Sequence, residues 1–288
     1  MRCNNKVCLT GKTVIVTGSN TGIGFETALE CAKRGAKVIV ACRDELKGSV
    51  AVQNIKTLTG NYNVILKLID FSSLQSVRRF ADDVLLTEER LDILINNAGA
   101  LALGNHITDD GFQLEMQVNY FGPALLTLIL IDLLKKSAPS RIVNVSSIAA
   151  KRAKMKSVDK LIAYDGHFDC YANTKLCVIL FTQELSKRLK QFDVSVFTLH
   201  PGYIATEILT RHLGPFKSCL TYMSRRIFKS PEEGAQTTLY CALESGIEHL
   251  TGGFFIECQY QEHFKTAQNP ILAEQLWYET IKFLNFSD

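Results

Sequence analysis

The chain has 288 residues, 47% of them hydrophobic and 21% charged, a composition that excludes a disordered or fibrous protein and suits one large globular domain. The formal net charge is +3, from 32 basic and 29 acidic residues. Such a small excess, with no long basic block, predicts no nucleic-acid partner.

Nine cysteines are scattered along the chain, and none has the spacing to a histidine that a zinc site needs. We therefore expect reduced thiols, no metal, and a cytoplasmic or cytosol-facing protein. Residues 1–6 contain no apolar stretch that resembles a signal peptide. The longest apolar run, residues 124–134, is interrupted by Asp132 and is too short to cross a bilayer, so no transmembrane segment is predicted.

Apolar, β-rich runs alternate with helical patterns along most of the chain. In order, we predict a strand at 13–17, a helix at 23–34, a strand at 37–41, a helix at 45–58, a strand at 63–69, a helix from the capping pair Ser72 and Ser73 to about 89, and strands at 91–95, 141–145 and 193–199. Strands that are apolar on both faces belong in a parallel sheet that is covered by helices on both sides.

This alternation predicts an α/β fold, a Rossmann-type doubly wound parallel sheet with right-handed crossovers. The sequence shows no linker, repeat or low-complexity segment, so a single domain over residues 1–288 is expected. Two irregular stretches, 151–167 and about 203–230, are predicted to be functional loops, the second a substrate loop.

A glycine-rich loop joins the first predicted strand to the first helix, as in dinucleotide-binding βαβ units. Gly18 would allow a tight turn, Gly22 would let the backbone approach a pyrophosphate, and Gly24 would let helix and sheet pack closely. The helix that begins here would direct free N–H groups at the phosphates. The residues predicted to bind the cofactor in this loop are Gly18, Ser19, Asn20, Thr21, Gly22, Ile23 and Gly24.

The end of the second strand indicates which dinucleotide is preferred. An NAD enzyme commonly has Asp or Glu there, whereas this chain has Arg43, whose guanidinium fork suits a 2′-phosphate. Lys47 would add positive charge one turn further on. We therefore predict NADP(H) as the cofactor. Asp44 is the competing ribose ligand of an NAD enzyme, although its position past the strand favours a helix N-cap.

Polar and small residues follow two further strands, at the edge where open α/β sheets bind ligands. Asp70 ends the third strand and would accept a hydrogen bond from the adenine amine. Asn97, Ala98 and Gly99 end the fourth strand, where small residues would let the chain pass close under the adenine ribose.

Tyr171 and Lys175 lie four residues apart at the start of a long helical stretch, so they share one helix face. A nearby cation, or an oxidised nicotinamide ring, would favour the phenolate of a tyrosine. Ser147 closes the fifth strand, so its hydroxyl is expected to face the same cleft. Asn119 stands within a helical stretch where asparagine is unfavourable. It would hold a water there, or else be an exposed or internally bonded amide.

Together these features resemble the classical branch of the short-chain dehydrogenase/reductase family, over about residues 10–260. The resemblance rests on the spaced glycines, on residues 96–99, and on Asn119, Ser147, Tyr171-x-x-x-Lys175 and Pro201-Gly202. Several stretches are similar to the retinol dehydrogenase 11–14 group. These are residues 41–44, 141–147, 179–185, 200–202 and 234–237.

The resemblance implies a role for each matching residue. Tyr171 would exchange a proton with the substrate oxygen, and Ser147 would bind that oxygen, since the family's catalytic serine is usually the second of such a pair. Lys175 would bind the nicotinamide ribose and lower the tyrosine pKa, while Asn119 would position a water in a proton relay. The nicotinamide and phosphate side would be lined by Pro201, Gly202 and Thr206.

The implied activity is that of an NADP(H)-dependent oxidoreductase that interconverts a lipophilic alcohol and its aldehyde or ketone, with a retinoid as the leading substrate. A steroid, an isoprenoid or a xenobiotic carbonyl is the alternative. A non-catalytic NADP(H)-sensing protein is a third hypothesis, but a sensor has no need of the full set of Asn119, Ser147, Tyr171 and Lys175.

The resemblance also bears on location. Members of the retinol dehydrogenase group often begin with a membrane-anchoring apolar helix, whereas this chain begins without one and has Ala150 where they often have histidine. Association with a membrane, that of the endoplasmic reticulum, is implied by the resemblance alone. Monomer and homo-oligomer both stay open.

Overall fold

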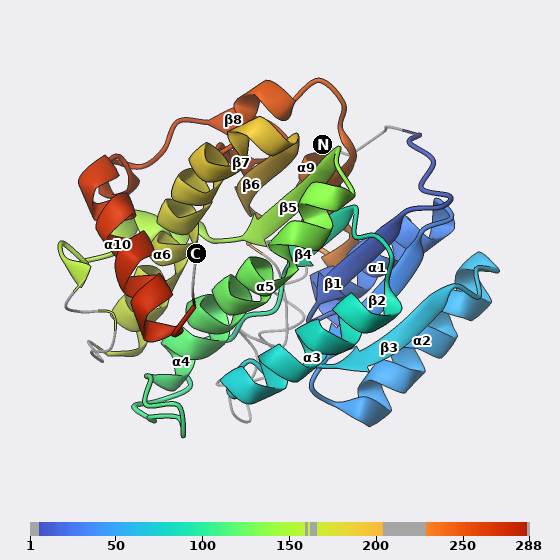
Figure 1. The fold of residues 1–288 in the computed structure, drawn as a ribbon, viewed down its shortest axis with the longest axis horizontal. Helices are drawn as coiled ribbons and strands as arrows, with labels where there is room; N and C mark the ends of the chain where they lie inside the picture. Colours follow the sequence, from blue (N-terminus) through green and yellow to red (C-terminus); the bar gives the residue numbers. More distant parts are fainter. Residues whose placement is uncertain (1–5, 159–160, 162–165, 204–228, 287–288) are drawn as a thin grey trace.

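The computed structural model describes residues 6–158, 161, 166–203 and 229–286. These residues form a central sheet with helices on both faces (Figure 1), which confirms the predicted doubly wound α/β fold. The sheet has eight strands in the order β3-β2-β1-β4-β5-β6-β7-β8. Their bounds are Thr13–Thr17, Lys37–Cys42, Val64–Leu68, Ile93–Asn96, Ser140–Val145, Val194–His200, Phe254–Ile256 and Gln259–Gln261 for β1 to β8.

Strands β1 to β7 are parallel, as expected of strands that are buried on both faces. The six predicted strands are all present; the first has the predicted bounds, and the other five differ by one or two residues at one or both ends. Two strands were not predicted, β7 and the antiparallel edge strand β8. The strand order reverses between β1, which pairs with β2, and β4, which pairs with β1 on its other side. Ligands bind at the carboxyl edge of such a switch point in open α/β sheets.

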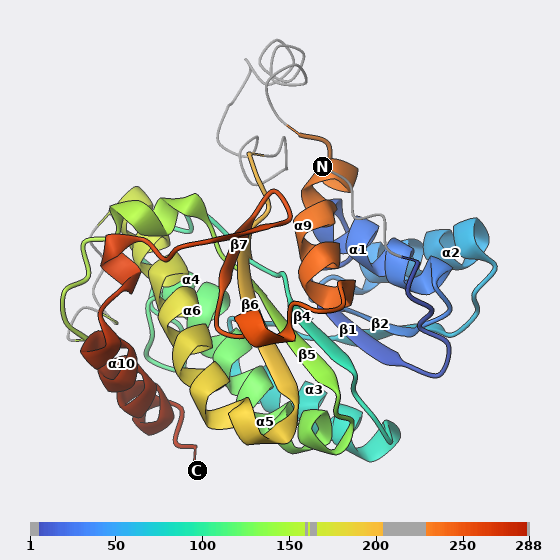
Figure 2. The ribbon, with the colours of Figure 1, turned by 90° about the horizontal axis from the view of Figure 1, so that it is seen from above.

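The helices form two layers (Figure 2), with α1, α2 and α9 over one face of the sheet and α3, α5 and α6 over the other. Helix α10 packs against α6 at the outside. The α-helices are α1 Gly22–Lys33, α2 Glu45–Thr59, α3 Leu74–Thr87, α4 Leu114–Met116, α5 Gly122–Lys136, α6 His167–Leu189, α9 Pro231–Leu243 and α10 Pro270–Phe283. Short 3-10 helices are η2 Ile148–Arg152, η4 Lys190–Phe192, η6 Glu248–Leu250 and η7 Lys265–Ala267.

A single run of helix covers residues 114–136, because a π-helical segment, η1 Gln117–Phe121, joins α4 to α5. By length and composition alone this run could cross a membrane, but most of its apolar window is buried inside the protein. Large side chains such as Phe121 and Leu125 belong to the core between the sheet and α3, α6 and α10. The run is therefore placed as a core helix.

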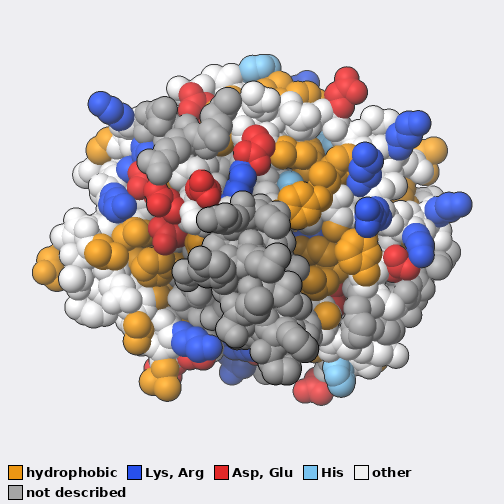
Figure 3. Space-filling view, turned by 180° about the vertical axis from the view of Figure 1, so that it is seen from behind, with side chains coloured by type: hydrophobic (Ala, Val, Ile, Leu, Met, Phe, Trp, Pro, Cys, Tyr) orange, Lys and Arg blue, Asp and Glu red, His pale blue; other side chains and the backbone are white. Residues whose placement is uncertain are grey.

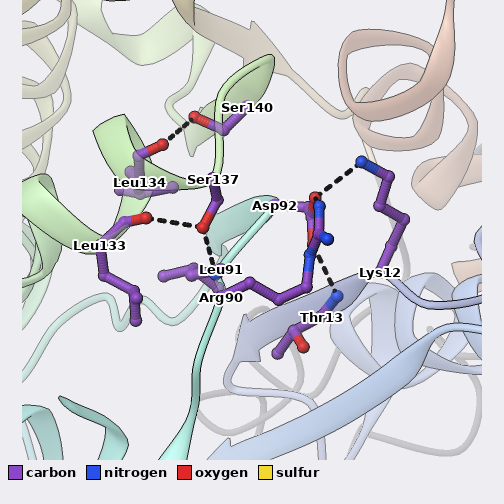
Figure 4. Close-up of polar contacts among 9 residues, drawn as sticks. All are labelled: Lys12, Thr13, Arg90, Leu91, Asp92, Leu133, Leu134, Ser137 and Ser140. Carbon is purple, nitrogen blue, oxygen red and sulfur yellow. Dashed lines mark hydrogen bonds and ion pairs between the residues drawn. The ribbon is translucent and has the colours of Figure 1, made fainter.

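The amino edge of the sheet is held by a buried carboxylate, Asp92, shown in Figure 4. Asp92 is 3% exposed and accepts hydrogen bonds from Lys12 Nζ at 2.9 Å, Thr13 N at 2.9 Å and Arg90 Nε at 2.8 Å. Nearby, Ser137 accepts from Leu91 N at 2.8 Å at the end of α5. These contacts tie the starts of β1 and β4 together, on the opposite edge from the switch-point ligand site.

We expect Asp92→Asn to lower the free energy of unfolding by about 2 kcal/mol, since an amide cannot satisfy two cations and a backbone N–H. Burial alone would raise the pKa of Asp92, but hydrogen bonds from Arg90, Lys12 and Thr13 hold it below its usual range. Its contribution to stability is therefore present above the unfolded-state pKa of about 4 and is lost as pH falls through the folded-state value.

Urea unfolding of both proteins at pH 7 and pH 3 measures this effect. The matched control is Asp132→Asn, which removes a carboxylate that is 86% exposed and lies 3.0 Å from Lys135 Nζ. We expect the control to change stability by less than about 0.5 kcal/mol. Equal losses in the two variants, or a loss at Asp92 that does not shrink at pH 3, would contradict the assignment.

Candidate active site

The glycine-rich loop connects β1 to α1 at the switch point. The backbone angles or the close neighbours of its glycines disfavour any residue with a side chain. Gly18 has φ 65°, and a Cβ there would lie 2.9 Å from the Cα of Ala98. A Cβ at Gly24 would clash with the carbonyl oxygen of Gly18 and lie 2.5 Å from Asn97 Nδ2. Gly22 has φ 61° with open space beside it. The loop therefore packs tightly against the end of β4 and leaves its Gly22 side free.

Some polar groups of the loop are hydrogen-bonded within the protein, and others are open to a ligand. Ser19 is fully buried and donates its hydroxyl hydrogen to the carbonyl of Val16 at 2.6 Å. Thr21 is the N-cap of α1, but its side chain makes no capping hydrogen bond. The first-turn N–H groups of α1 are therefore open to an anion such as a pyrophosphate. Asn20 and Ile23 are half-buried beside them.

The end of β4 is bonded to the loop through Thr17, a residue that the sequence analysis did not single out. Its hydroxyl accepts from Asn97 N and Ala98 N, both at 3.0 Å. Asn97 Nδ2 in turn donates to the carbonyl of Thr17 at 2.8 Å. Asn97 and Ala98 thus brace the floor of the site, while Gly99 follows them toward the catalytic helix.

The end of β2 presents a free cation. Arg43 follows the last strand residue, is exposed, and forms no hydrogen bond or ion pair within the part of the chain that the structure describes. Asp44 is the N-cap of α2 and accepts from Lys47 N at 3.0 Å, which confirms the N-cap interpretation. The ammonium of Lys47 lies 3.8 Å from the same carboxylate.

Asp70 lies two residues beyond β3, which ends at Leu68. Its Oδ1 accepts from Ser72 N at 2.9 Å and from Ser72 Oγ at 2.7 Å, so this oxygen closes the turn that leads into α3. Ser73, the second of the predicted capping pair, is the N-cap of that helix. An adenine amine would therefore have to use the other oxygen of Asp70.

Asn119 occupies the middle of the π-helical segment η1 and is 2% exposed. Its Oδ1 accepts from Ala100 N at 2.7 Å, and its Nδ2 donates to Ala100 O at 2.8 Å and to Thr174 Oγ1 at 3.3 Å. The internally bonded amide, one of the alternatives that the sequence left open, is what the structure has. A water would have to bind to another group of this turn.

The catalytic candidates meet between β5 and α6. Ser147 lies beside Tyr171, and its hydroxyl acts to lower the pKa of the phenol. Lys175 Nζ lies 5.7 Å from the centre of the Tyr171 ring and donates to the carbonyl of Val145 at 3.0 Å. Ser146 is instead buried, with its hydroxyl donating to the carbonyl of Lys175 at 2.7 Å. Ser147 is therefore the serine that reaches the tyrosine.

Burial dominates the proton affinities of this pair. It raises the pKa of Tyr171 to about 12, against the opposing effect of the Ser147 hydrogen bond, and it lowers the pKa of Lys175 to about 8. The lowering expected for Tyr171 from the neighbouring cation does not appear. The ammonium is directed at Val145, and desolvation of the phenolate outweighs it. At neutral pH the tyrosine is a phenol, the form that can donate a proton.

Glu115 is a further buried group that the sequence analysis missed. It is fully buried, and its Oε2 accepts from Leu103 N at 3.2 Å. Burial raises the pKa of Glu115 to about 7, although N–H groups of Leu103 and Ala102 and the charge of Lys175 oppose this. The signal was available, because a carboxylate four residues before Asn119 in an apolar helix shares its helix face.

Pro201 and Gly202 follow β6 at the same carboxyl edge, and Gly202 has φ 99°. Thr206 and residues 204–228 of the expected substrate loop lie outside the described residues. At its base, Lys229 N donates to the carbonyl of Tyr203 at 2.9 Å. Among the described residues, no group of histidine, cysteine, aspartate and glutamate side chains could hold a metal ion.

Comparison with known proteins gives a consistent set of similarities. A family model described as short chain dehydrogenase matches residues 12–213. Retinol dehydrogenase 11 of Homo sapiens is 43% identical over 277 residues, which cover 96% of this chain and 86% of that protein. A crystal structure of an uncharacterized protein from Mycobacterium Paratuberculosis aligns with a TM-score of 0.78 and 29% identity, over 97% of this chain and 96% of that one. The Pseudomonas aeruginosa RhlG/NADP active-site complex aligns with a TM-score of 0.69 and 25% identity, over 86% and 95%.

Proposed function

Because this chain belongs to the short-chain dehydrogenase/reductase family, we propose that it is an NADP(H)-dependent oxidoreductase that interconverts a lipophilic alcohol and its aldehyde or ketone, a retinoid first among them. The observation that carries the proposal is the meeting of Ser147, Tyr171 and Lys175 at the carboxyl edge of the sheet, beside the open N-terminus of α1.

The nicotinamide cofactor, when bound, supplies the hydride chemistry. The residues of the chain manage the proton. In carbonyl reduction the phenol of Tyr171 donates its proton to the substrate oxygen as negative charge develops there. Ser147, which lies beside Tyr171, hydrogen-bonds the same oxygen. The ammonium of Lys175 then stabilises the phenolate. In alcohol oxidation the phenolate is the base, so this direction requires the tyrosine to lose its proton first.

The choice of NADP(H) rests on charge. Arg43 is free to pair with a 2′-phosphate, whereas Asp44 is engaged as a helix N-cap and is poorly placed to act as a ribose ligand. The similarity to an NADP complex supports the same cofactor. The cofactor-binding residues that we propose are Gly18, Ser19, Asn20, Thr21, Gly22, Ile23, Gly24, Arg43, Lys47, Asp70, Asn97, Ala98, Gly99, Tyr171, Lys175, Pro201, Gly202 and Thr206.

The lipophilic substrate class is supported by the similarity to retinol dehydrogenase 11. It is also supported by hydrophobic side chains that gather in the face shown in Figure 3, beside lysine and arginine side chains. The seven cysteines whose placement is described are not in disulfides, which favours a reducing, cytosol-facing environment. Association with a membrane such as that of the endoplasmic reticulum is proposed from the similarity to retinol dehydrogenase 11 alone.

A panel of retinoid, steroid and isoprenoid alcohols and aldehydes, assayed with NADP(H) and NAD(H), tests the proposal. We expect turnover of retinal or retinol with NADP(H) at a higher kcat/KM than for the other classes. A preference for steroids or isoprenoids would change the proposed substrate class and leave the proposed reaction unchanged. Tight NADPH binding without turnover of any compound would contradict the enzymatic proposal and favour a sensor.

A further inference from the structure

Glu115 lies in the short helix α4, which packs against the catalytic helix α6. Its carboxylate is fully buried, and its Oε1 has no hydrogen-bond partner within the described part of the chain. A buried charge with an unsatisfied oxygen is costly unless an opposite charge compensates it. The side chain therefore stays ionised at low cost only if a cation lies close by.

One loop passes close to both Lys175 and Glu115. A Cβ on Gly99 would lie 3.3 Å from Lys175 Nζ and 3.4 Å from Asn119 Oδ1. A few residues on, Leu103 donates its N–H group to Glu115 Oε2 at 3.2 Å. Ala102 has φ 59°, a backbone conformation that is unfavourable for alanine. Residues 99–103 thus run from beside the catalytic lysine to the buried carboxylate, and they are held by Asn119 at Ala100 and by Glu115 at Leu103.

The ionisable groups that face Glu115 come from α6. Lys175 attracts its negative charge, and Tyr171 would be repelled as a phenolate. Cys170 adds a thiol, whose sulfur lies 3.3 Å from Gln113 Oε1 at the start of α4. His106, whose carbonyl accepts from Leu114 N, is exposed. Among the described residues, Lys175 is the cation whose positive charge lowers the pKa of Glu115.

We propose that Glu115 is a positioning residue of the active site: it holds the strained loop at Ala102 and supplies the counter-charge that keeps the buried ammonium of Lys175 protonated. This inference rests on the proposed function, in which Lys175 acts on Tyr171. Protons in the centre are then shared among three coupled groups, and the titration of each depends on the other two.

The negative charge of Glu115 shifts the pKa values of Lys175 and Tyr171 in the same direction. Burial lowers the pKa of Lys175 to about 8, and Glu115 opposes that lowering. Burial raises the pKa of Tyr171 to about 12, and Glu115 contributes in the same upward direction. Without the negative charge, both groups release their protons at lower pH. A neutral replacement should therefore shift the whole pH profile toward acid rather than narrow it.

Glu115→Gln is the decisive variant, because glutamine keeps the shape and an acceptor for the loop but removes the charge. In alcohol oxidation the active form has Tyr171 deprotonated and Lys175 protonated, so kcat against pH has a rising and a falling limb that together report the coupled loss of these two protons. We expect both limbs to move to lower pH by roughly one unit. A uniform fall in kcat with both limbs unmoved would mean that Glu115 only supports the loop structurally, and it would overturn the inference.

The matched control is Glu88→Gln. Glu88 is also buried, but it pairs with Lys37 Nζ at 2.7 Å on the opposite edge of the sheet. We expect it to lower stability and leave both limbs in place. Glu115→Asp, which keeps the charge, should restore the limbs toward their parental positions even where the shorter side chain loosens the loop. Limbs that move equally in Glu88→Gln or Glu115→Asp would contradict a specific charge effect.

A second readout needs no turnover. Lysine side chains labelled with 13C and 15N can be titrated by NMR in the protein alone, with Lys175→Met to assign the Lys175 signal. Its midpoint should fall in Glu115→Gln and stay in place in Glu88→Gln. An unmoved midpoint overturns the inference even if activity is lost. Absence of turnover in the parent with every alcohol, aldehyde and cofactor would instead contradict the proposed function, whatever the NMR titration shows.

Discussion

Tyr171→Phe is expected to lower kcat by about 10² to 10⁴-fold in both directions of the reaction, with cofactor binding and fold largely unchanged. The phenolic hydroxyl of Tyr171 is the proposed proton donor, and its phenolate is the proposed acceptor; Ser147 lies beside it. Phenylalanine keeps the ring and its packing on α6 but has no proton to exchange. The effect should therefore appear in the chemical step and not in the affinity for NADP(H).

Steady-state rates with the best substrate of the panel, together with a fluorescence titration of NADPH, separate the two quantities. Tyr278→Phe on α10 is the matched control, since it removes the hydroxyl of a tyrosine that is 56% exposed on the outer layer. It should retain parental kcat. Activity of Tyr171→Phe within twofold of the parent would remove Tyr171 from the proposed mechanism.

Arg43→Ala should weaken NADPH binding by about 10 to 100-fold and leave NADH binding nearly unchanged. Hydrogen bonds to charged groups contribute roughly 1.5 to 3 kcal/mol, and every 1.4 kcal/mol corresponds to about tenfold in affinity. NADH has no 2′-phosphate with which Arg43 could pair. Arg43 is exposed and no described contact depends on its guanidinium, so we expect the variant to keep its fold.

Lys47 can share the phosphate and reduce the effect of the single change, so Arg43→Ala with Lys47→Ala is the sharper test. Arg79→Ala, an exposed arginine on α3, controls for the loss of one positive charge elsewhere on the surface. Each protein is titrated with both cofactors at one ionic strength. Equal or tighter NADH binding by the parent would mean that Asp44, despite its capping role, sets the cofactor preference.

The strands of the sheet could be predicted where their own sequences are long and apolar enough to indicate a strand. Strands β1 to β6 are four to seven residues long and rich in apolar residues, so they can be recognised from the sequence. Strands β7 and β8 have three residues each, and their pairing with β6 and with each other depends on contacts far along the chain. Helix α6 begins at His167, before the Tyr171 motif, after Gly166 with φ 96°. Only the folded chain reveals that start.

The candidate site divides in the same way. Its residue types and spacing pointed to the chemistry, because Tyr171 and Lys175 share a helix face whatever the rest of the fold does. Their proton affinities could not be predicted, since burial decides them and is a property of the assembled layers. The internal bonds of Asn119, and the position of Glu115 beside α6, depend likewise on packing between segments that are distant in sequence.

The π-helical segment Gln117–Phe121 has a consequence for the phase of the helix that contains it. One additional residue in a helical turn rotates everything beyond it by about 100°. Upstream of the segment, Glu115 is directed at the loop over the catalytic lysine, while downstream Leu125 and Leu128 are directed into the core. A regular α-helix of the same sequence would bring one of these two faces out of alignment. The extra residue allows one continuous helix to serve a polar site and an apolar core at different angles.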